Sequence, residues 1–274
     1  MIEILNTLLT ALFDLLFLPF RALPPVGSLL VFSVLTGILM LWTFGKVSNQ
    51  DSIRVVRDRT RGNLMGIRLF GDSIALLFRL QFRIFRDLTI YLKYALIPLL
   101  VMLIPVLLIL TQLNLRYAKR PLEPGETALV KIKLRSPLTL QDGVTLEVPD
   151  GVTLETPGVR IEAQKEVAFR IRADEPGRYV LLVRAGGATL DKEILVGGDW
   201  QAVSEKKTGA NVFDQILYPG EKSIPSSSPF RSVEVGYASR KLTVLGFNLD
   251  WILSFLVISI VAGFVFKGPL GVEF

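Results

Sequence analysis

The chain has 274 residues, half of them hydrophobic, with 31 Lys and Arg against 25 Asp and Glu. Its mean hydropathy of +0.47 indicates an integral membrane protein rather than one soluble core. It has no cysteine and no histidine, which excludes disulfides, thiolate nucleophiles, Cys/His zinc sites and Ser–His or Cys–His catalysis. We therefore expect binding rather than chemistry: no enzyme, no cofactor and no metal site.

The first segment, 1–20, is rich in Leu, Ile and Phe but carries one polar stripe. Glu3, Thr7, Thr10 and Asp14 follow one another at spacings of three or four residues, which places them on one face of a helix. No Lys or Arg precedes the apolar run, so it does not look like a secretory signal peptide. The pattern predicts an amphipathic helix that lies in the membrane interface.

Three later stretches predict membrane spans. Residues 27–45 and 94–113 contain 19 and 20 residues without a charge, close to the roughly 20 that a helix needs to cross a bilayer. Residues 251–266 provide only 16 uncharged residues between Asp250 and Lys267, or roughly 24 Å of helix. For this third span we expect local bilayer thinning or snorkelling of Lys267.

The segment 46–93 is strongly basic, with ten Lys and Arg against four acids. Because short basic loops stay in the cytoplasm, we expect this segment inside, the N-terminus outside and the C-terminus inside. The long segment 114–248 then lies outside, since long loops cross largely regardless of charge. A bacterial inner (plasma) membrane is the default location.

Within this basic segment two helices are expected, 53–70 and 73–92, joined by a Gly-Asp pair. Arg79, Arg83 and Arg86 share one face of the second helix at i, i+4 and i+7. This helical hairpin predicts contact with anionic lipid headgroups or a landing surface for a ribosome or nascent chain. No motif indicates specific nucleic-acid binding. Apolar residues recur near the helical period at Ile74, Leu77, Phe78, Phe85, Leu88 and Leu92.

From residue 121 to 198 the pattern changes to short alternating runs separated by Pro-Gly, Asp-Gly and Gly-Gly pairs. About six such runs predict a small β-sandwich of immunoglobulin-like character within 114–248. The alternation resumes over 232–247, which predicts a return to the sheet. The aspartates stand in or beside turns, where Asp is common for turn reasons alone. The runs are ALVKIKLR, VTLEVPDG, GVRIEAQ, EVAFRIRA, GRYVLLVRAG and ATLDKEILV.

The fold class is therefore an α-helical three-span bundle with a cytoplasmic hairpin and an extracytoplasmic β-domain. The exit from the first span, FGKVSNQDSIRVVRDR (44–59), and the entry to the second, LKYALIPLLVMLIPVLLI (92–109), carry a family likeness. The layout resembles the minimal three-span branch of the YidC–Oxa membrane protein insertase superfamily, with an added β-domain. The resemblance implies an insertase or chaperone whose partners are lipids, hydrophobic nascent or client membrane proteins and the ribosome.

Such an insertase offers clients a polar groove open to the cytoplasm and to lipid. Six polar residues inside the predicted spans are candidates to line it, although each also fits the role of helix-packing glue. They are Thr36, Thr43, Thr111, Gln112, Ser254 and Ser259.

Two other functions fit the same sequence. A non-catalytic envelope scaffold would use the β-sandwich to bind a periplasmic partner and the spans as an anchor. An accessory subunit of a membrane complex would need about three spans, but these spans carry no ion-binding carboxylates.

Overall fold

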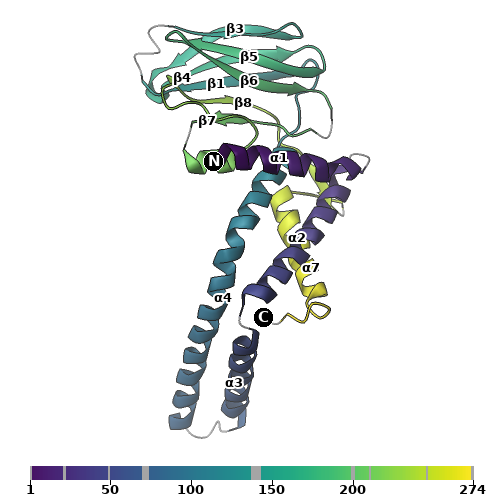
Figure 1. Ribbon diagram of the computed structural model, residues 1–274, viewed down its shortest axis with the longest axis vertical. Helices are drawn as coiled ribbons and strands as arrows, with labels where there is room; N and C mark the ends of the chain where they lie inside the picture. The colour runs from purple at the N-terminus through teal and green to yellow at the C-terminus, as the bar shows by residue number, and fades with distance from the viewer. Residues whose placement is uncertain are drawn as a thin grey trace. The chain divides into compact units, whose positions relative to one another are not determined.

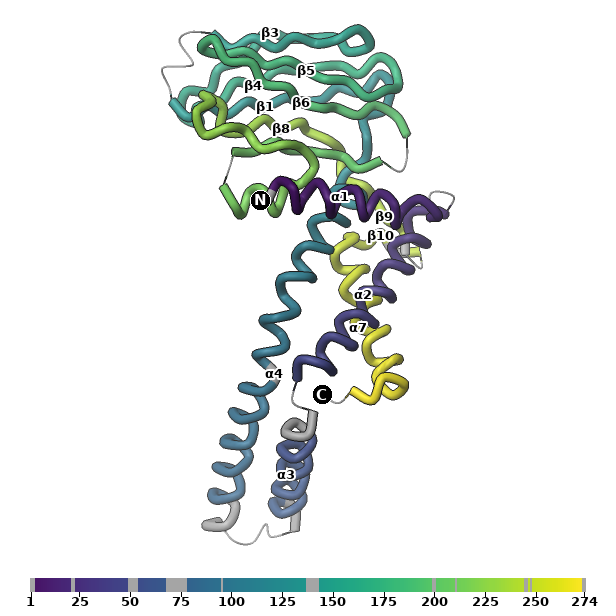
Figure 2. The backbone as a smooth tube through the Cα atoms, viewed as in Figure 1, coloured from purple at the N-terminus to yellow at the C-terminus, as the bar shows by residue number. Residues whose placement is uncertain are grey.

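The computed structural model describes residues 2–20, 23–48, 50–69, 74–136, 143–198, 201–209, 211–244 and 246–272. The chain forms two compact units (Figures 1 and 2). One, here the β-unit, comprises Met1–Val26 and Leu108–Trp251, and the other, the helical unit, comprises Gly27–Leu107 and Ile252–Phe274. The N-terminal segment therefore belongs to the same unit as the β-strands.

The helices follow the predicted apolar and basic segments. Among the described residues, three segments are long and apolar enough to cross a membrane: Glu3–Phe20, Pro25–Val47 and Phe78–Tyr117. The prediction of helices that could span a membrane, together with a separate region of β-strands, is thus confirmed. The helices are α1 (Ile2–Phe17), η1 (Leu18–Phe20), α2 (Pro25–Val47), α3 (Gln50–Leu69), α4 (Ile74–Tyr117), α6 (Val212–Leu217) and α7 (Trp251–Phe266).

Length and composition select a different third helix from the one that we expected. α7 has the predicted bounds, but its 16 residues make it a shorter apolar helix. Glu3–Phe20, for which we expected an interfacial helix, is instead long and apolar enough to cross a membrane. A hydropathy average does not depend on where polar residues lie around a helix. Whether the polar residues of α1 contact other parts of the protein is therefore important for choosing between an interfacial and a spanning helix.

In the helical unit, α2 packs against α7 through a glycine. A Cβ atom on Gly37 would lie 2.4 Å from the backbone oxygen of Ser259 and 3.1 Å from Cβ of Ala262. The two backbones therefore approach closely, as small residues allow in membrane helix pairs. The buried face of α2 consists of Ser28, Leu29, Phe32, Ser33, Thr36, Gly37 and Leu41.

The basic segment forms two helices, and the second continues into the apolar stretch as one helix of 44 residues. The helices contact each other through Asn63, whose Nδ2 donates to Oδ2 of Asp87 at 3.2 Å. Leu80 also approaches Gly66, where an added Cβ would lie 3.3 Å from its Cδ1. The predicted turn between the helices, residues 70–73, lies outside the described residues.

In the β-unit each of the six alternating runs contributes to a strand. A five-stranded sheet has the order β3-β4-β1-β8-β7, a three-stranded sheet the order β2-β5-β6, and β9 pairs with β10. All these pairings are antiparallel. The strands are β1 (Thr127–Leu134), β2 (Val144–Glu147), β3 (Val152–Ile161), β4 (Glu166–Ala173), β5 (Gly177–Ala185), β6 (Ala188–Val196), β7 (Lys206–Thr208), β8 (Phe230–Val235), β9 (Leu242–Val244) and β10 (Phe247–Leu249).

The two larger sheets share one hydrophobic core. Val130 of β1, Phe169 of β4 and Val233 of β8 belong to the same buried cluster as Leu181 of β5 and Ile194 of β6. Alternate residues of β1 point inward, since every second side chain of this strand is buried. This is a sandwich arrangement. The first part of the alternation predicted at 232–247 returns to it as β8, whereas Leu242–Val244 form β9, which pairs with β10 in a separate sheet.

Candidate functional site

The predicted basic row lies on the first turns of α4. Arg79 and Arg83 are exposed, and the side chain of Arg86 is 57% exposed, with Nη2 3.2 Å from Oδ1 of its neighbour Asp87. Asp87 itself is buried and also accepts the hydrogen bond from Asn63. The arginines thus face outward while the acid holds the two helices together.

A row of phenylalanines runs beside the arginines. Phe78, Phe82 and Phe85 are 74%, 74% and 60% exposed, and they repeat the arginine spacing one position earlier. Two adjacent rows on a helix follow from this shared spacing. We call Phe78, Arg79, Phe82, Arg83, Phe85 and Arg86 the hairpin stripe.

The apolar residues that recur near the helical period in this part of α4 do not form the face that packs against α3. Phe78, Phe85, Leu88 and Leu92 are exposed, whereas Leu80 is buried beside Gly66. Glycine at the contact lets a side chain outside the longest apolar row approach the partner helix. The side chains of Ile74 and Leu77 lie outside the described residues.

Four of the six groove candidates belong to the helical unit. Thr36 on α2 and Ser254 on α7 are buried. Thr43 donates to the carbonyl of Leu39 at 2.8 Å, and Ser259 to that of Leu256 at 3.1 Å. Ser259 provides the backbone oxygen at the close contact with Gly37, and Thr36 precedes Gly37 in the sequence, so both positions lie at or beside the α2–α7 contact.

The other two candidates, Thr111 and Gln112, belong to the β-unit, at the end of α4. Thr111 Oγ1 donates to the carbonyl of Leu108 at 3.0 Å. Gln112 is almost completely buried, and its Nε2 donates to Oγ1 of Thr10 on α1 at 3.0 Å. Gln112 therefore links two helices of the β-unit.

The polar stripe of α1 faces the rest of the β-unit. Asn6 donates to the carbonyl of Gln215 in α6 at 2.8 Å, and Glu3 accepts from the backbone nitrogen of Ser223 at 3.2 Å. Thr7 bonds only within its own helix in the described contacts, to the carbonyl of Glu3. Asn6 was absent from the predicted stripe, although it lies three residues after Glu3.

Asp14 completes this polar side through Arg116. The guanidinium of Arg116 is 3% exposed, forms an ion pair with Asp14 and donates to the carbonyl of Gln112 at 3.0 Å. Its charged centre also lies 4.9 Å from the ring centroid of Phe17. We call Glu3, Asn6, Thr10 and Asp14 the docking row of α1.

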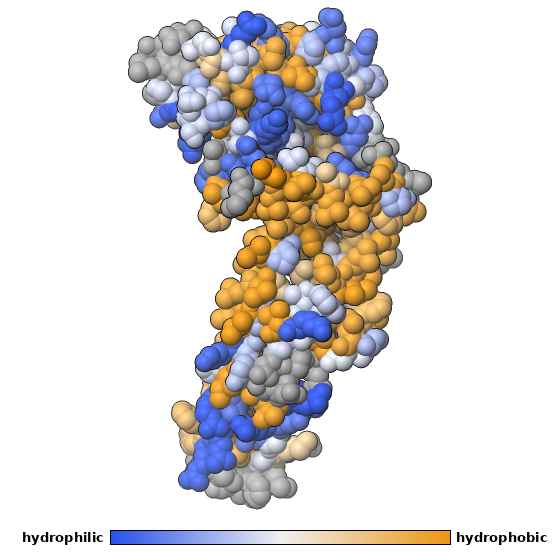
Figure 3. All heavy atoms as spheres, in the orientation of Figure 1, coloured by the Kyte–Doolittle hydropathy of each residue, from blue (hydrophilic) through white to orange (hydrophobic). Residues whose placement is uncertain are grey.

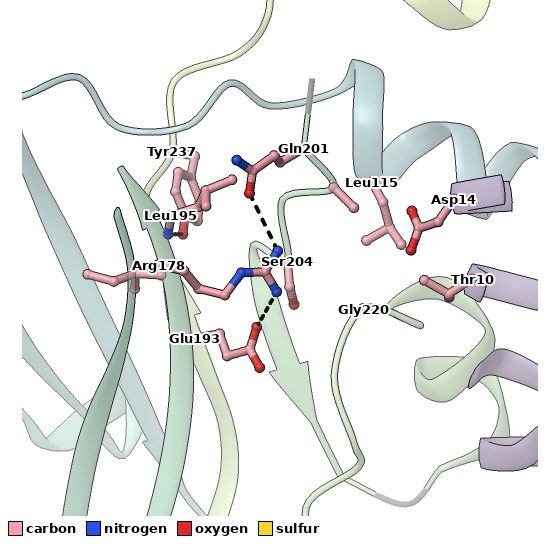
Figure 4. Close-up of a pocket in the computed structure, with 12 residues that line it drawn as sticks. Thr10, Asp14, Leu115, Arg178, Glu193, Leu195, Gln201, Ser204, Gly220 and Tyr237 are labelled. Atoms are coloured by element: carbon pink, nitrogen blue, oxygen red, sulfur yellow. Dashed lines mark hydrogen bonds and ion pairs between the residues drawn. The ribbon is translucent and has the colours of Figure 1, made fainter. Parts of the chain in front are cut away.

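Two polar cavities lie in the β-unit beside the docking row. One of about 480 Å³ is lined by Thr10, Asp14, Glu193 and other residues, and Figure 4 shows Thr10 and Asp14 opposite the strand residues. Arg178 lies between Glu193, at 3.2 Å, and Gln201, at 3.5 Å. The second cavity, of about 720 Å³, is lined by further residues of α1, β6 and β7.

A buried ion pair lies at the edge strand β6, near these cavities. Nζ of Lys192 bonds to the carboxylate of Glu221 and to the carbonyls of Ser204, at 2.7 Å, and Glu193, at 3.2 Å. Burial lowers the pKa of Lys192, while Glu221 opposes that shift. Glu221 also accepts the backbone N–H of Glu193, and Tyr237 accepts that of Leu195. These side chains thus form hydrogen bonds with backbone N–H groups at the edge of β6, which could otherwise pair with another strand.

Within the described part of the chain, no group of three or more acidic residues could hold a metal ion. Comparison with protein-family models, with curated proteins and with solved structures found no match for this chain. The functional argument therefore rests on the residues and contacts given above.

Proposed function

We propose that this protein is a membrane protein insertase or chaperone of the YidC-like type. In this proposal the hairpin receives hydrophobic client segments in the cytoplasm and passes them along a polar groove between the spans. The observation that carries it is the hairpin stripe, where exposed Phe and Arg side chains stand in adjacent rows on a helix that continues unbroken into an apolar stretch.

The stripe suits a client that combines a hydrophobic segment with polar flanks. Exposed aromatic rings offer apolar surface to the segment, and guanidinium groups attract acidic flanks, nascent chains or lipid phosphates. A chain that only anchored a β-domain would need neither row.

The groove would lower the free energy of moving a client's polar flank through hydrocarbon, which costs several kcal/mol for each unsatisfied polar group. Its proposed lining is the candidate set given above. Thr36 and Ser254 face the interior of the helical unit.

The orientation belongs to the same proposal. The basic hairpin lies in the cytoplasm of a cell with a bacterial-type inner membrane, the N-terminus lies outside and the C-terminus inside. The β-domain, an immunoglobulin-like sandwich, then lies outside, where it contacts a periplasmic protein.

A second candidate is the scaffold, and the cavities of the β-unit favour it. Their volumes of about 480 and 720 Å³ and their charged linings suit a polar segment of a partner protein. An accessory subunit of a membrane complex would use the same surface.

Photo-crosslinking during translation of short membrane-protein clients tests the proposal. A photoreactive residue replaces Phe82 or Arg83 in the stripe, or Ile104, which is 66% exposed further along α4. The control position is Val159 on β3, which is 59% exposed. Nascent chains linked to the first three positions and not to Val159 support an insertase. Crosslinks only to lipid and to one fixed protein contradict it and favour the scaffold.

A triple variant tests the arginine row of the stripe. Arg79, Arg83 and Arg86 changed to Gln should reduce client crosslinking, most strongly at low salt, because exposed charges are screened by salt. The control removes three exposed charges from the β-unit instead: Lys131, Arg160 and Arg170 changed to Gln. Equal losses in both triples would attribute the effect to net charge rather than to the stripe.

A further inference from the structure

The helix α1 has two faces, one bonded to other parts of the β-unit and one exposed. Its docking row is engaged by Ser223, Gln215, Gln112 and Arg116, as described above. The opposite face is apolar and exposed, and α1 carries no Lys or Arg. Its exposed residues, between 44% and 65% accessible, are Ile4, Leu5, Leu8, Leu12, Leu15 and Leu16.

The short helix α6 also carries exposed apolar side chains. Val212, Phe213 and Leu217 are 50%, 76% and 48% exposed. The hydrogen bond from Asn6 to Gln215 holds α6 against the first half of α1, and Figures 1 and 2 show the two helices side by side. Asn211 caps α6 by accepting the N–H of Phe213 at 3.3 Å.

We group the exposed apolar residues of these two adjacent helices as the α1–α6 platform: Ile4, Leu5, Leu8, Leu12, Leu15, Leu16, Val212, Phe213 and Leu217. Figure 3 shows a continuous hydrophobic band over α1. Contiguous apolar surface of this kind is rare against water and marks an interface with lipid or protein.

The chain itself places a bilayer within reach of the platform. Seven residues separate Phe17 from Pro25, where the apolar helix α2 begins, so they can span at most roughly 25 Å. In addition, Thr10 and Asp14 bond to Gln112 and Arg116 in the last turns of α4, at the end of its apolar stretch. The last turns of α4 therefore hold α1 at the end of that apolar stretch.

We propose that the α1–α6 platform lies in the boundary between lipid headgroups and acyl chains, on the membrane side that carries the β-unit, with Phe213 as an anchor. The polar docking row then points away from the lipid and the apolar face toward it, as for a monotopic helix. Phe213 adds a second point of attachment beside α1, so the base of the β-unit is held against the bilayer. This inference does not depend on insertase activity.

The absence of native cysteine permits a direct test on the full chain in lipid nanodiscs. Single cysteines replace Phe213, Leu217 or Leu12 and carry an environment-sensitive fluorophore, with Val159 on β3 as the matched exposed control. At the three platform positions we expect blue-shifted fluorescence emission. Lipids that carry a nitroxide near the headgroup end of the acyl chain should quench most of this emission. Val159 should respond only to an aqueous quencher.

Three results would overturn the proposal. Phe213 and Leu217 behaving like Val159 would put α6 in water. Strongest quenching of Leu12 by nitroxides at the methyl end of the acyl chain would mean that the first helix crosses the bilayer. Crosslinking between Phe213→Cys copies in separate chains, without lipid quenching, would make the platform an interface between two copies.

Phe213→Ser in the Leu217→Cys protein should reduce lipid quenching at 217 while the unfolding temperature stays unchanged. Undiminished quenching would remove the anchor role.

Discussion

Arg116 in the last turn of α4 and Asp14 on α1 form an ion pair across 102 residues of sequence. The two ends of this pair differ, because the side chain of Arg116 is 3% exposed and that of Asp14 is 56% exposed. The buried cation depends on its partner for compensation, whereas water hydrates the carboxylate. This pair and the Gln112–Thr10 hydrogen bond hold α1 to the last turns of α4 within the β-unit.

We therefore expect Asp14→Asn to destabilise the protein. It keeps the side-chain shape but leaves the buried Arg116 without a counter-charge, a loss of about 1–3 kcal/mol for a buried group that loses its partner. Thermal unfolding in detergent micelles measures it. Thr7→Ala, on the same helix but outside the docking row, is the control. Equal shifts in both variants would mean that the ion pair does not secure α1.

The α2–α7 contact predicts a sharp difference between two glycines. Gly37→Ala places a Cβ 2.4 Å from the backbone oxygen of Ser259, and we expect a loss of about 1–3 kcal/mol from overpacking. Gly263→Ala makes the same change on α7 where no atom lies within 4 Å, and it should be neutral or slightly stabilising. Detergent-resistance assays compare the two variants. A tolerated alanine at position 37 would show that the helices do not pack there.

The buried pair of Lys192 and Glu221 predicts a strong coupling. Lys192→Met leaves the carboxylate of Glu221, 4% exposed, without a counter-charge, a loss of about 3–5 kcal/mol. Adding Glu221→Leu should recover part of that loss, although the N–H of Glu193 then lacks its acceptor. A double-mutant cycle by thermal unfolding measures the coupling. Additive effects would show that the two groups act independently.

Acid should weaken the β-unit partly through Asp191. Burial raises the pKa of this carboxyl, but the hydrogen bond and charge of Lys207 outweigh burial and lower it below the usual 3.8. Because the unfolded chain then binds the proton first, the stabilisation is present above that pKa and is lost as pH falls through the lowered one. We expect the free energy of unfolding to decline as pH falls from the usual 3.8 through the lowered pKa of Asp191.

Asp191→Asn should flatten this decline, while Asp150→Asn, in an exposed turn, should leave it nearly unchanged. Chemical unfolding at a series of pH values gives the slopes. If both variants retain the full slope, the Asp191–Lys207 pair does not contribute to acid sensitivity.

Local patterns determined the elements of this protein. The uncharged runs at 27–45 and 94–113 and the alternation of the six β runs act within a few residues, because helical rise and strand pleat are local properties. The shared spacing of Arg79, Arg83 and Arg86 likewise predicted one exposed row. The polar stripe of α1 predicted that the helix has two faces.

Only the tertiary structure decided what each face meets. The stripe showed a polar side on α1 but not that Arg116 would bind Asp14, and the apolar period of α4 did not reveal that Leu80 packs at Gly66. α6 was absent from the predicted elements, since six residues carry too little periodicity to detect. Lys192 occupies a position that alternation assigns to the interior, and its partner Glu221 comes from a distant loop. Periodicity divides an element into faces, but the choice of partner depends on where the chain returns, because burial and charge compensation are settled between segments far apart in the sequence.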